Sequence, residues 1–254
     1  MATGGTTSIK CKWENGLQRF YDSATDETVR VMSPVWFKDD FLGEEELVSE
    51  AGSQGIWNTR DVGDATEAIR VAIASGVFRL HLHATSEAED AVLDWADNTS
   101  LCVLNDVQFE CKIDMATLPT TGVVAVFGMC GDHNLDKDTT AESAWFRMDA
   151  SGVLKVESDD GTTNTDDTAT GTTLVAGTAN IFRIDFSDLS DVKFFIDGVR
   201  TAASTTHDMS ALTTTTGLMQ PYFSLDKASG TGVGDMDIDY VAIWGRRSSL
   251  IANS

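Results

Sequence analysis

Two histidines and a glutamate form the first pattern that could bind a metal ion. His81 and His83 share one face of a predicted strand, and Glu87 follows shortly after them. Imidazole and carboxylate groups that converge from one strand can hold a single transition-metal ion. No second motif with a further histidine surrounds His133 or His207. We therefore expect His81 and His83 to be a solvated pair on a strand.

An acidic segment offers oxygen ligands instead. Aspartate or asparagine occupies every second position from 132 to 138. An EF-hand calcium loop needs glycine at its sixth position and glutamate at its twelfth. Lys137 and Ser143 stand at those positions. The segment is therefore predicted to be a plain acidic loop.

Tryptophans could build a platform for sugar rings, because the apolar face of an indole stacks against a pyranose. Large aromatics at alternating strand positions normally pack between sheets instead. We expect most of them in the core and keep the platform as an alternative. The residues concerned are Trp36, Trp57, Trp95 and Trp145.

The elements that must position these residues are β-strands. Apolar and polar residues alternate at 76–84, 106–115 and 180–186, which is typical of strands with one buried face. The Asp197-Gly198 pair supplies the left-handed positions of a tight hairpin turn. Residues 86–97 are predicted to be a turn followed by a strand, and the Thr- and Asp-rich segment 158–173 is predicted to be a polar surface loop.

Composition limits the partners. The chain has 254 residues, and its 18 basic and 40 acidic side chains give a formal charge of −22. Such a surface repels phosphate backbones and anionic headgroups, so nucleic acid and membrane are excluded as partners. The N-terminal segment shows no signal-peptide pattern and no window is apolar enough to span a bilayer. The four cysteines show no metal-binding spacing and are expected to be free thiols.

Three segments are expected along the chain. Residues 1–38 are predicted to be an N-terminal β-hairpin arm, residues 39–247 one all-β domain, and residues 248–254 a loose tail. Single β-sandwich domains commonly reach this size.

The main segment resembles concanavalin-A-like jelly-roll domains of the laminarinase and lichenase type. The resemblance rests on DDF at 39–41, FFIDGVR at 194–200 and MDIDYVAIW at 236–244. It implies a sandwich of two curved antiparallel sheets. In the lichenase-like relatives an aspartate on the closing strand helps to hold a structural calcium, and Asp239 matches that position. The resemblance thus makes Asp239 a candidate calcium ligand, with an ordinary polar strand residue as the alternative.

The enzymes of that family carry the pattern E-x-D-x-x-E, in which one glutamate attacks the sugar and another protonates the leaving oxygen. The matching segment here is ESAWFR at 142–147, where Glu142 is kept but Ala144 and Arg147 replace the other two acids. A second near match at 157–162 has Thr162 in place of the last glutamate. The catalytic acids are therefore predicted to be absent, and the chain is predicted not to be an enzyme.

The whole pattern also resembles structural proteins that decorate the capsids of tailed phages. That resemblance implies a virion protein made in the host cytoplasm and located on the capsid surface. Its expected partners are the phage major capsid protein and further copies of itself, for example in a trimer at a symmetry axis. A lectin-like module that binds host glycans is the first alternative. A glycoside hydrolase with displaced acids is the second.

Overall fold

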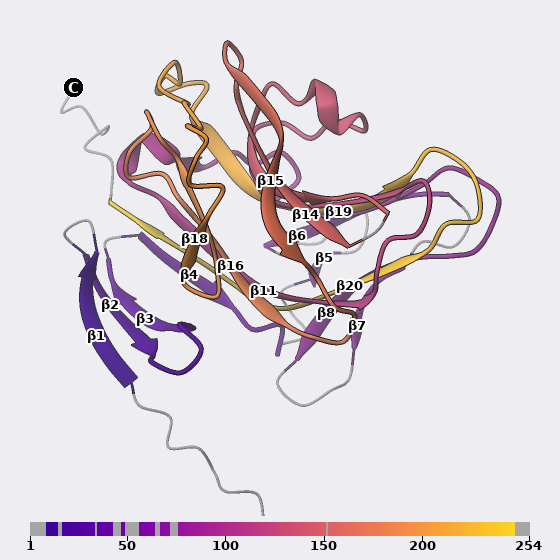
Figure 1. Cartoon of the computed structure of the whole chain (residues 1–254), viewed down its shortest axis with the longest axis horizontal. Helices are drawn as coiled ribbons and strands as arrows, with labels where there is room; N and C mark the ends of the chain where they lie inside the picture. Colours follow the sequence, from indigo (N-terminus) through magenta and orange to yellow (C-terminus); the bar gives the residue numbers. More distant parts are fainter. Residues whose placement is uncertain are drawn as a thin grey trace, which may run out of the picture.

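The computed structural model describes residues 9–14, 17–33, 35–42, 47–48, 56–63, 67–71, 76–150 and 152–246. Two large sheets pack face to face, and a small sheet lies beside them (Figure 1). Among the strands that the structure describes, hydrogen-bonded neighbours are antiparallel except β5 and β6, which are parallel. This architecture confirms the predicted all-β sandwich of two antiparallel sheets.

The first large sheet has nine strands. Its main path runs β15-β14-β13-β12-β19-β9-β6-β5, and β10 pairs with β19 beside that path. The strands are β5 (Leu47–Val48), β6 (Trp57–Val62), β9 (Glu89–Asp94), β10 (Leu101–Cys102), β12 (Val123–Cys130), β13 (Glu142–Met148), β14 (Val153–Asp160), β15 (Asn164–Thr173) and β19 (Leu218–Lys227).

The second large sheet has eight strands. Its main path runs β18-β17-β16-β11-β20-β8-β7, and β4 pairs with β20. The strands are β4 (Val35–Asp39), β7 (Glu67–Val71), β8 (Val77–Leu82), β11 (Gln108–Thr117), β16 (Asn180–Asp185), β17 (Lys193–Ile196), β18 (Val199–Thr201) and β20 (Gly234–Gly245). Two short 3₁₀ turns, η1 (Val103–Asn105) and η2 (Lys137–Thr139), lie in the connections.

Strand periodicity places the core between the two large sheets. In the central strands of both sheets, alternate residues are apolar and buried, as Phe109 and Ile113 are on β11 and Phe127 is on β12. Successive side chains of a strand point to opposite faces. The intervening residues therefore lie on the outer faces of the two sheets.

The predicted strand after residue 86 is β9, and the Asp197-Gly198 turn is also confirmed, because both residues have positive φ (49° and 77°). The loop predicted at 158–173 is wrong. Its residues finish β14 and form β15, which pairs with β14 at the edge of the nine-stranded sheet. β-branched threonines favour extended backbone, and an edge strand can be polar on both faces.

The small sheet consists of β1 (Ile9–Glu14), β2 (Leu17–Asp22) and β3 (Thr28–Met32). It packs on the outer face of the eight-stranded sheet, where Leu17 and Val31 meet Tyr240 and Trp244. The following strand, β4, already pairs with β20 in the large sheet. The predicted arm therefore contains three strands resting on the main domain, together with a strand that belongs to that domain. The predicted tail at 248–254 lies outside the described residues.

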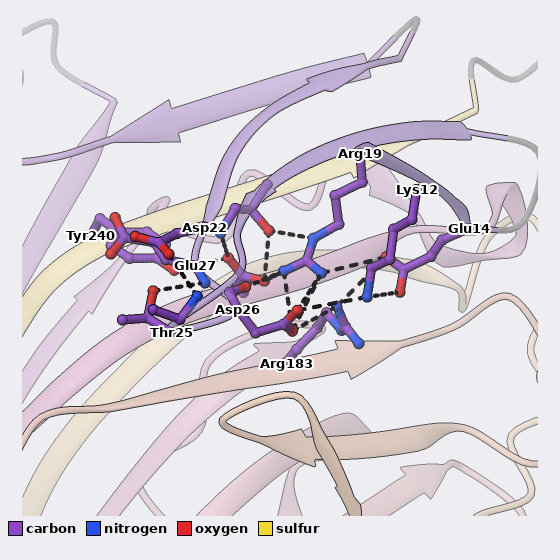
Figure 2. A network of polar contacts seen from close by, with 12 residues as sticks. Lys12, Glu14, Arg19, Asp22, Thr25, Asp26, Glu27, Arg183 and Tyr240 are labelled. Atoms are coloured by element: carbon purple, nitrogen blue, oxygen red, sulfur yellow. Dashed lines mark hydrogen bonds and ion pairs between the residues drawn. The ribbon is translucent and has the colours of Figure 1, made fainter. Parts of the chain in front are cut away.

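A network of charges holds the small sheet in place (Figure 2). The guanidinium of Arg19 is fully buried and lies 2.9 Å from Glu110 Oε2 on β11. The other carboxylate oxygen of Glu110 accepts hydrogen bonds from the Thr28 amide and the Tyr240 hydroxyl. Both ends of the buried ion pair are thus neutralised and hydrogen-bonded.

No described helix is long and apolar enough to cross a membrane.

Candidate functional site

The outer face of the nine-stranded sheet carries an unusual number of buried polar groups. A second apolar cluster forms its floor and includes Trp145 and Tyr222, whose ring centroids are 6.1 Å apart. The loop between β12 and β13, residues 131–141, folds over this floor. Its His133 Nδ1 lies 3.1 Å from the Tyr222 hydroxyl oxygen, and its Lys137 ammonium lies 5.6 Å from the centre of the Tyr222 ring.

A cavity of about 440 Å³ lies between this loop and the sheet. This volume falls within the range of small-molecule sites. We call it the outer-face cavity. Its lining combines apolar and charged side chains: Val62, Ala88, Glu89, Asp90, Val124, Leu135, Asp136, Lys137, Asp138, Arg147, Asp226, Lys227 and Ala228.

Two carboxylates and one ammonium dominate the electrostatics of the cavity. Lys137 is 5% exposed, and its Nζ lies 3.4 Å from Asp90 Oδ1 and 3.9 Å from Asp226 Oδ1. Ser224 donates a hydrogen bond of 3.0 Å to Asp90 Oδ1. Burial raises the pKa of Asp226 to about 6, with Lys137 opposing the shift and Asp90 adding to it. One ammonium therefore serves one buried carboxylate, that of Asp90, and one half-buried carboxylate, that of Asp226.

Some polar atoms of these two residues have no hydrogen-bond partner among the described residues. They are Asp90 Oδ2 and Asp226 Oδ1, and both are buried. A buried acceptor without a donor has lost its hydrogen bonds to water and has gained no protein hydrogen bond to replace them. The cavity therefore offers two acceptor positions to a ligand that carries donors.

A second charged cluster flanks the cavity on β13 and β14. Arg147 forms an ion pair with Asp138 of the covering loop and lies 3.4 Å from Glu157 Oε2. The Trp145 indole donates a hydrogen bond of 2.9 Å to that same oxygen. Burial raises the pKa of Glu157, although the Trp145 and Arg147 contacts oppose the shift. These contacts hold Arg147 at the cavity wall.

The rim of the cavity contains a buried ion pair of a different kind. Lys227 Nζ donates to the carbonyl oxygens of His83, Thr85 and Gly232 at 2.5–3.2 Å and lies 3.3 Å from Glu89 Oε1. Glu89 also accepts a hydrogen bond from the His83 amide at 2.9 Å. This pair is fully hydrogen-bonded and fixes the loops that border the cavity.

The segment expected to replace the catalytic strand is β13, which lies between β12 and β14. Ala144 is buried in the core between the sheets. By alternation, Ser143, Trp145 and Arg147 face the outer side. Glu142 borders a separate polar hollow beside Gly131 and Asp132. Strand β13 therefore brings the Arg147 cation to the outer-face cavity, and its glutamate lies elsewhere.

The other predicted site residues lie apart from the outer-face cavity. His81 contacts Asp235, and its ring centroid is 4.5 Å from that of His83. Asp239 Oδ2 lies 2.6 Å from the Lys112 ammonium. This ammonium already neutralises Asp239, so the residues present do not favour a calcium ion there, and the calcium ligand stays a prediction. Within the described ranges, no cluster of three or more His, Cys, Asp or Glu side chains has the geometry of a metal site.

The four tryptophans pack in apolar clusters, as expected for most of them. Trp57 is fully buried between the sheets, and Trp95 packs against the same core. Trp36 packs beneath the small sheet. Trp145 alone of the four lies on the floor beneath the covering loop, where it is 2% exposed. Trp145 therefore does not present an open platform.

Sequence reasoning missed Asp90, Lys137 as a cavity residue, and Asp226. Asp90 and Asp226 come from strands that are far apart in the chain and adjacent in the sheet, where they are direct register partners. The alternation Tyr222, Ser224, Asp226 on β19 is a signal that could have placed Asp226 on the outer face.

No protein-family model and no curated protein matches the chain. Solved structures do match its fold. A protein of unknown function from Shewanella oneidensis MR-1 has a TM-score of 0.55 at 10% identity, covering 82% of this chain and 84% of its own. A structure from a study of endo-acting O-glycanases of the human gut microbiota has a TM-score of 0.52 at 10% identity, covering 83% of this chain and 99% of its own.

The family 7 alginate lyase A1-II′ has a TM-score of 0.51 at 13% identity, covering 71% of this chain and 85% of its own. At these identities the likeness concerns the fold. It confirms the concanavalin-A-like sandwich that the sequence resembles. This fold is shared with carbohydrate-active proteins.

Proposed function

We propose that the chain is a carbohydrate-binding protein and that the outer-face cavity holds a sugar residue. The observation that carries this proposal is the pairing of two buried acceptors, Asp90 Oδ2 and Asp226 Oδ1, with the apolar side chains Val124 and Leu135 in one cavity. A sugar presents hydroxyl donors at its edge and C–H groups on its faces. It would satisfy the carboxylates and contact the apolar wall at once.

The comparisons support this proposal through the fold. The alginate lyase and the structure from the O-glycanase study are both associated by name with carbohydrate substrates. The expected role in decorating a phage capsid, and its partners and location, stay predictions of the sequence. The glycan-binding alternative has the better support, because it also has a cavity to which it can be assigned.

A glycan array followed by titration calorimetry of the hits tests the proposal. Val124 is half-buried in the cavity wall, so Val124→Trp should fill the cavity and abolish binding of the hits. Val199→Trp is the matched control, because Val199 is 71% exposed on the eight-stranded sheet. A silent array, or hits that bind both variants equally well, would refute the proposed site.

Glycan cleavage is a second candidate, favoured by Asp226. A carboxyl group whose pKa lies near 6 can donate a proton close to neutral pH. Incubating the hits with the protein and measuring new chain ends tests this activity. Cleavage that disappears in Asp226→Asn would establish catalysis, whereas intact glycans would leave binding as the sole activity.

A further inference from the structure

The outer-face cavity holds more negative than positive charge. Asp90 is 6% exposed, and Asp226 is the second carboxylate beside it. Among the described residues, the ammonium that forms ion pairs with these two carboxylates is that of Lys137, and it stands no closer than 3.4 Å to either of them. Arg147 is already engaged by Asp138 and Glu157. The Asp90, Lys137 and Asp226 cluster therefore keeps one uncompensated negative charge.

The neighbouring ion pair of Glu89 and Lys227 is an example of full charge compensation in this chain. Glu89 and Lys227 are both buried and carry one opposite charge each. The Lys227 ammonium also donates to three carbonyl oxygens. Neither residue has a buried polar atom without a hydrogen-bond partner in the part of the chain that the structure describes. In the Asp90 and Asp226 cluster, each carboxylate keeps one such oxygen.

An uncompensated carboxylate in a poorly hydrated site is costly, and a positive group that enters the site relieves this cost. The loop carbonyls of Asn134 and Leu135 lie 3.5 Å and 3.3 Å from Lys137 Nζ and add further negative partial charge. Burial also raises the pKa of Asp226, as expected for a carboxylate that lacks a close positive partner.

We propose that the outer-face cavity recognises a positively charged group, and that this group is the free amine of an amino sugar. The assignment of this group to an amino sugar rests on the proposed function. An ammonium group would donate to Asp90 Oδ2 and Asp226 Oδ1 while the sugar ring contacts the apolar wall. An N-acetylated sugar carries no charge, and a uronic acid would be repelled by both carboxylates.

Paired glycans that differ only at the amine test the proposal. Oligomers of glucosamine and of galactosamine are titrated at pH 7 against their N-acetylated forms and against a polyuronate, and calcium chloride is titrated separately. We expect the free-amine form to bind roughly 10- to 100-fold more tightly than its N-acetylated partner, because it adds charge-assisted hydrogen bonds. The polyuronate should bind most weakly.

The variant Asp226→Asn should reduce this preference to less than about threefold, since an amide of the same shape carries no charge. Asp188→Asn is the matched control, because Asp188 is an exposed carboxylate beside Lys193 in the other sheet. It should keep the preference of the native chain. Asp90→Asn gives a second, independent test at the other carboxylate.

The outcomes separate the two proposals. Equal affinity for amine and N-acetylated forms would overturn amine recognition and leave glycan binding standing. An array and titrations without any glycan ligand would remove both. Calcium binding without amine binding would assign the charge to a metal ion and overturn the amino-sugar assignment.

Discussion

At the scale of single residues, the buried His207 makes the unfolding free energy depend on pH. It is 1% exposed, its Nδ1 shares a hydrogen bond of 2.9 Å with Ser158 Oγ, and its ring packs edge-on against Phe194. Burial lowers its pKa from 6.5 to about 4, with Asp191 opposing and Arg200 adding to the shift. Between these pH values His207 is protonated in the unfolded chain but neutral in the folded chain. The unfolding free energy therefore falls as the pH falls from about 6.5 to 4.

The variant His207→Phe should remove this dependence. We expect the native chain to lose about 2 kcal/mol more unfolding free energy than the variant between pH 7 and pH 5. Asp226 acts in the opposite direction, since its pKa is raised from 3.8 to about 6 in the folded state, but it is present in both proteins and cancels. Denaturant unfolding at the two pH values measures the difference. Identical pH profiles would show that His207 titrates normally in the folded chain.

The residues of the outer-face cavity were harder to predict from the sequence than the strands or the fold. That Arg147 stands where the resembled enzymes carry an acid could be read from the sequence, because a motif gives the spacing. Asp90 and Asp226 could not be paired in this way. They lie on β9 and β19, and only the sheet topology makes them neighbours. The burial of Lys137 depends on how its loop folds back over the sheet, which no local pattern specifies.

At the scale of elements, the small sheet depends on the Arg19–Glu110 pair. Replacing Arg19 with Met leaves a buried Glu110 charge that only neutral donors accompany. We expect this variant to lose about 3–5 kcal/mol of unfolding free energy. It should also become open to protease cleavage in the β2–β3 turn, because the small sheet no longer stays docked. Denaturant unfolding and limited proteolysis measure the two effects.

The matched control is Arg30→Met. Arg30 lies in the same small sheet on β3 but is exposed, so its loss should change stability by less than about 0.5 kcal/mol. If Arg19→Met were as stable and as protease-resistant as Arg30→Met, the buried pair would not be what anchors the sheet.

Strands with strict alternation were predictable, and polar strands were not. β8, β11 and β16 alternate cleanly because each has one face in the core. The edge strand β15 is polar on both faces, so its sequence carries no burial signal and reads as a loop. Its place is set by pairing with β14, which is a property of the sheet.

At the scale of the whole molecule, the sandwich follows from the number of alternating segments and their turns. Two sheets that each bury one face must pack against each other, and this leaves two outer faces. In this chain the small sheet covers part of one outer face, and a loop folds over the other. The outer-face cavity lies beneath that loop, on the nine-stranded sheet.

Soaking crystals of the protein with its best glycan ligand tests the central claim most directly. We expect difference density for a sugar residue between loop 131–141 and strands β9, β12 and β19, within hydrogen-bond distance of Asp90 and Asp226. Density on the eight-stranded sheet, or at the polar hollow beside Glu142, would contradict it.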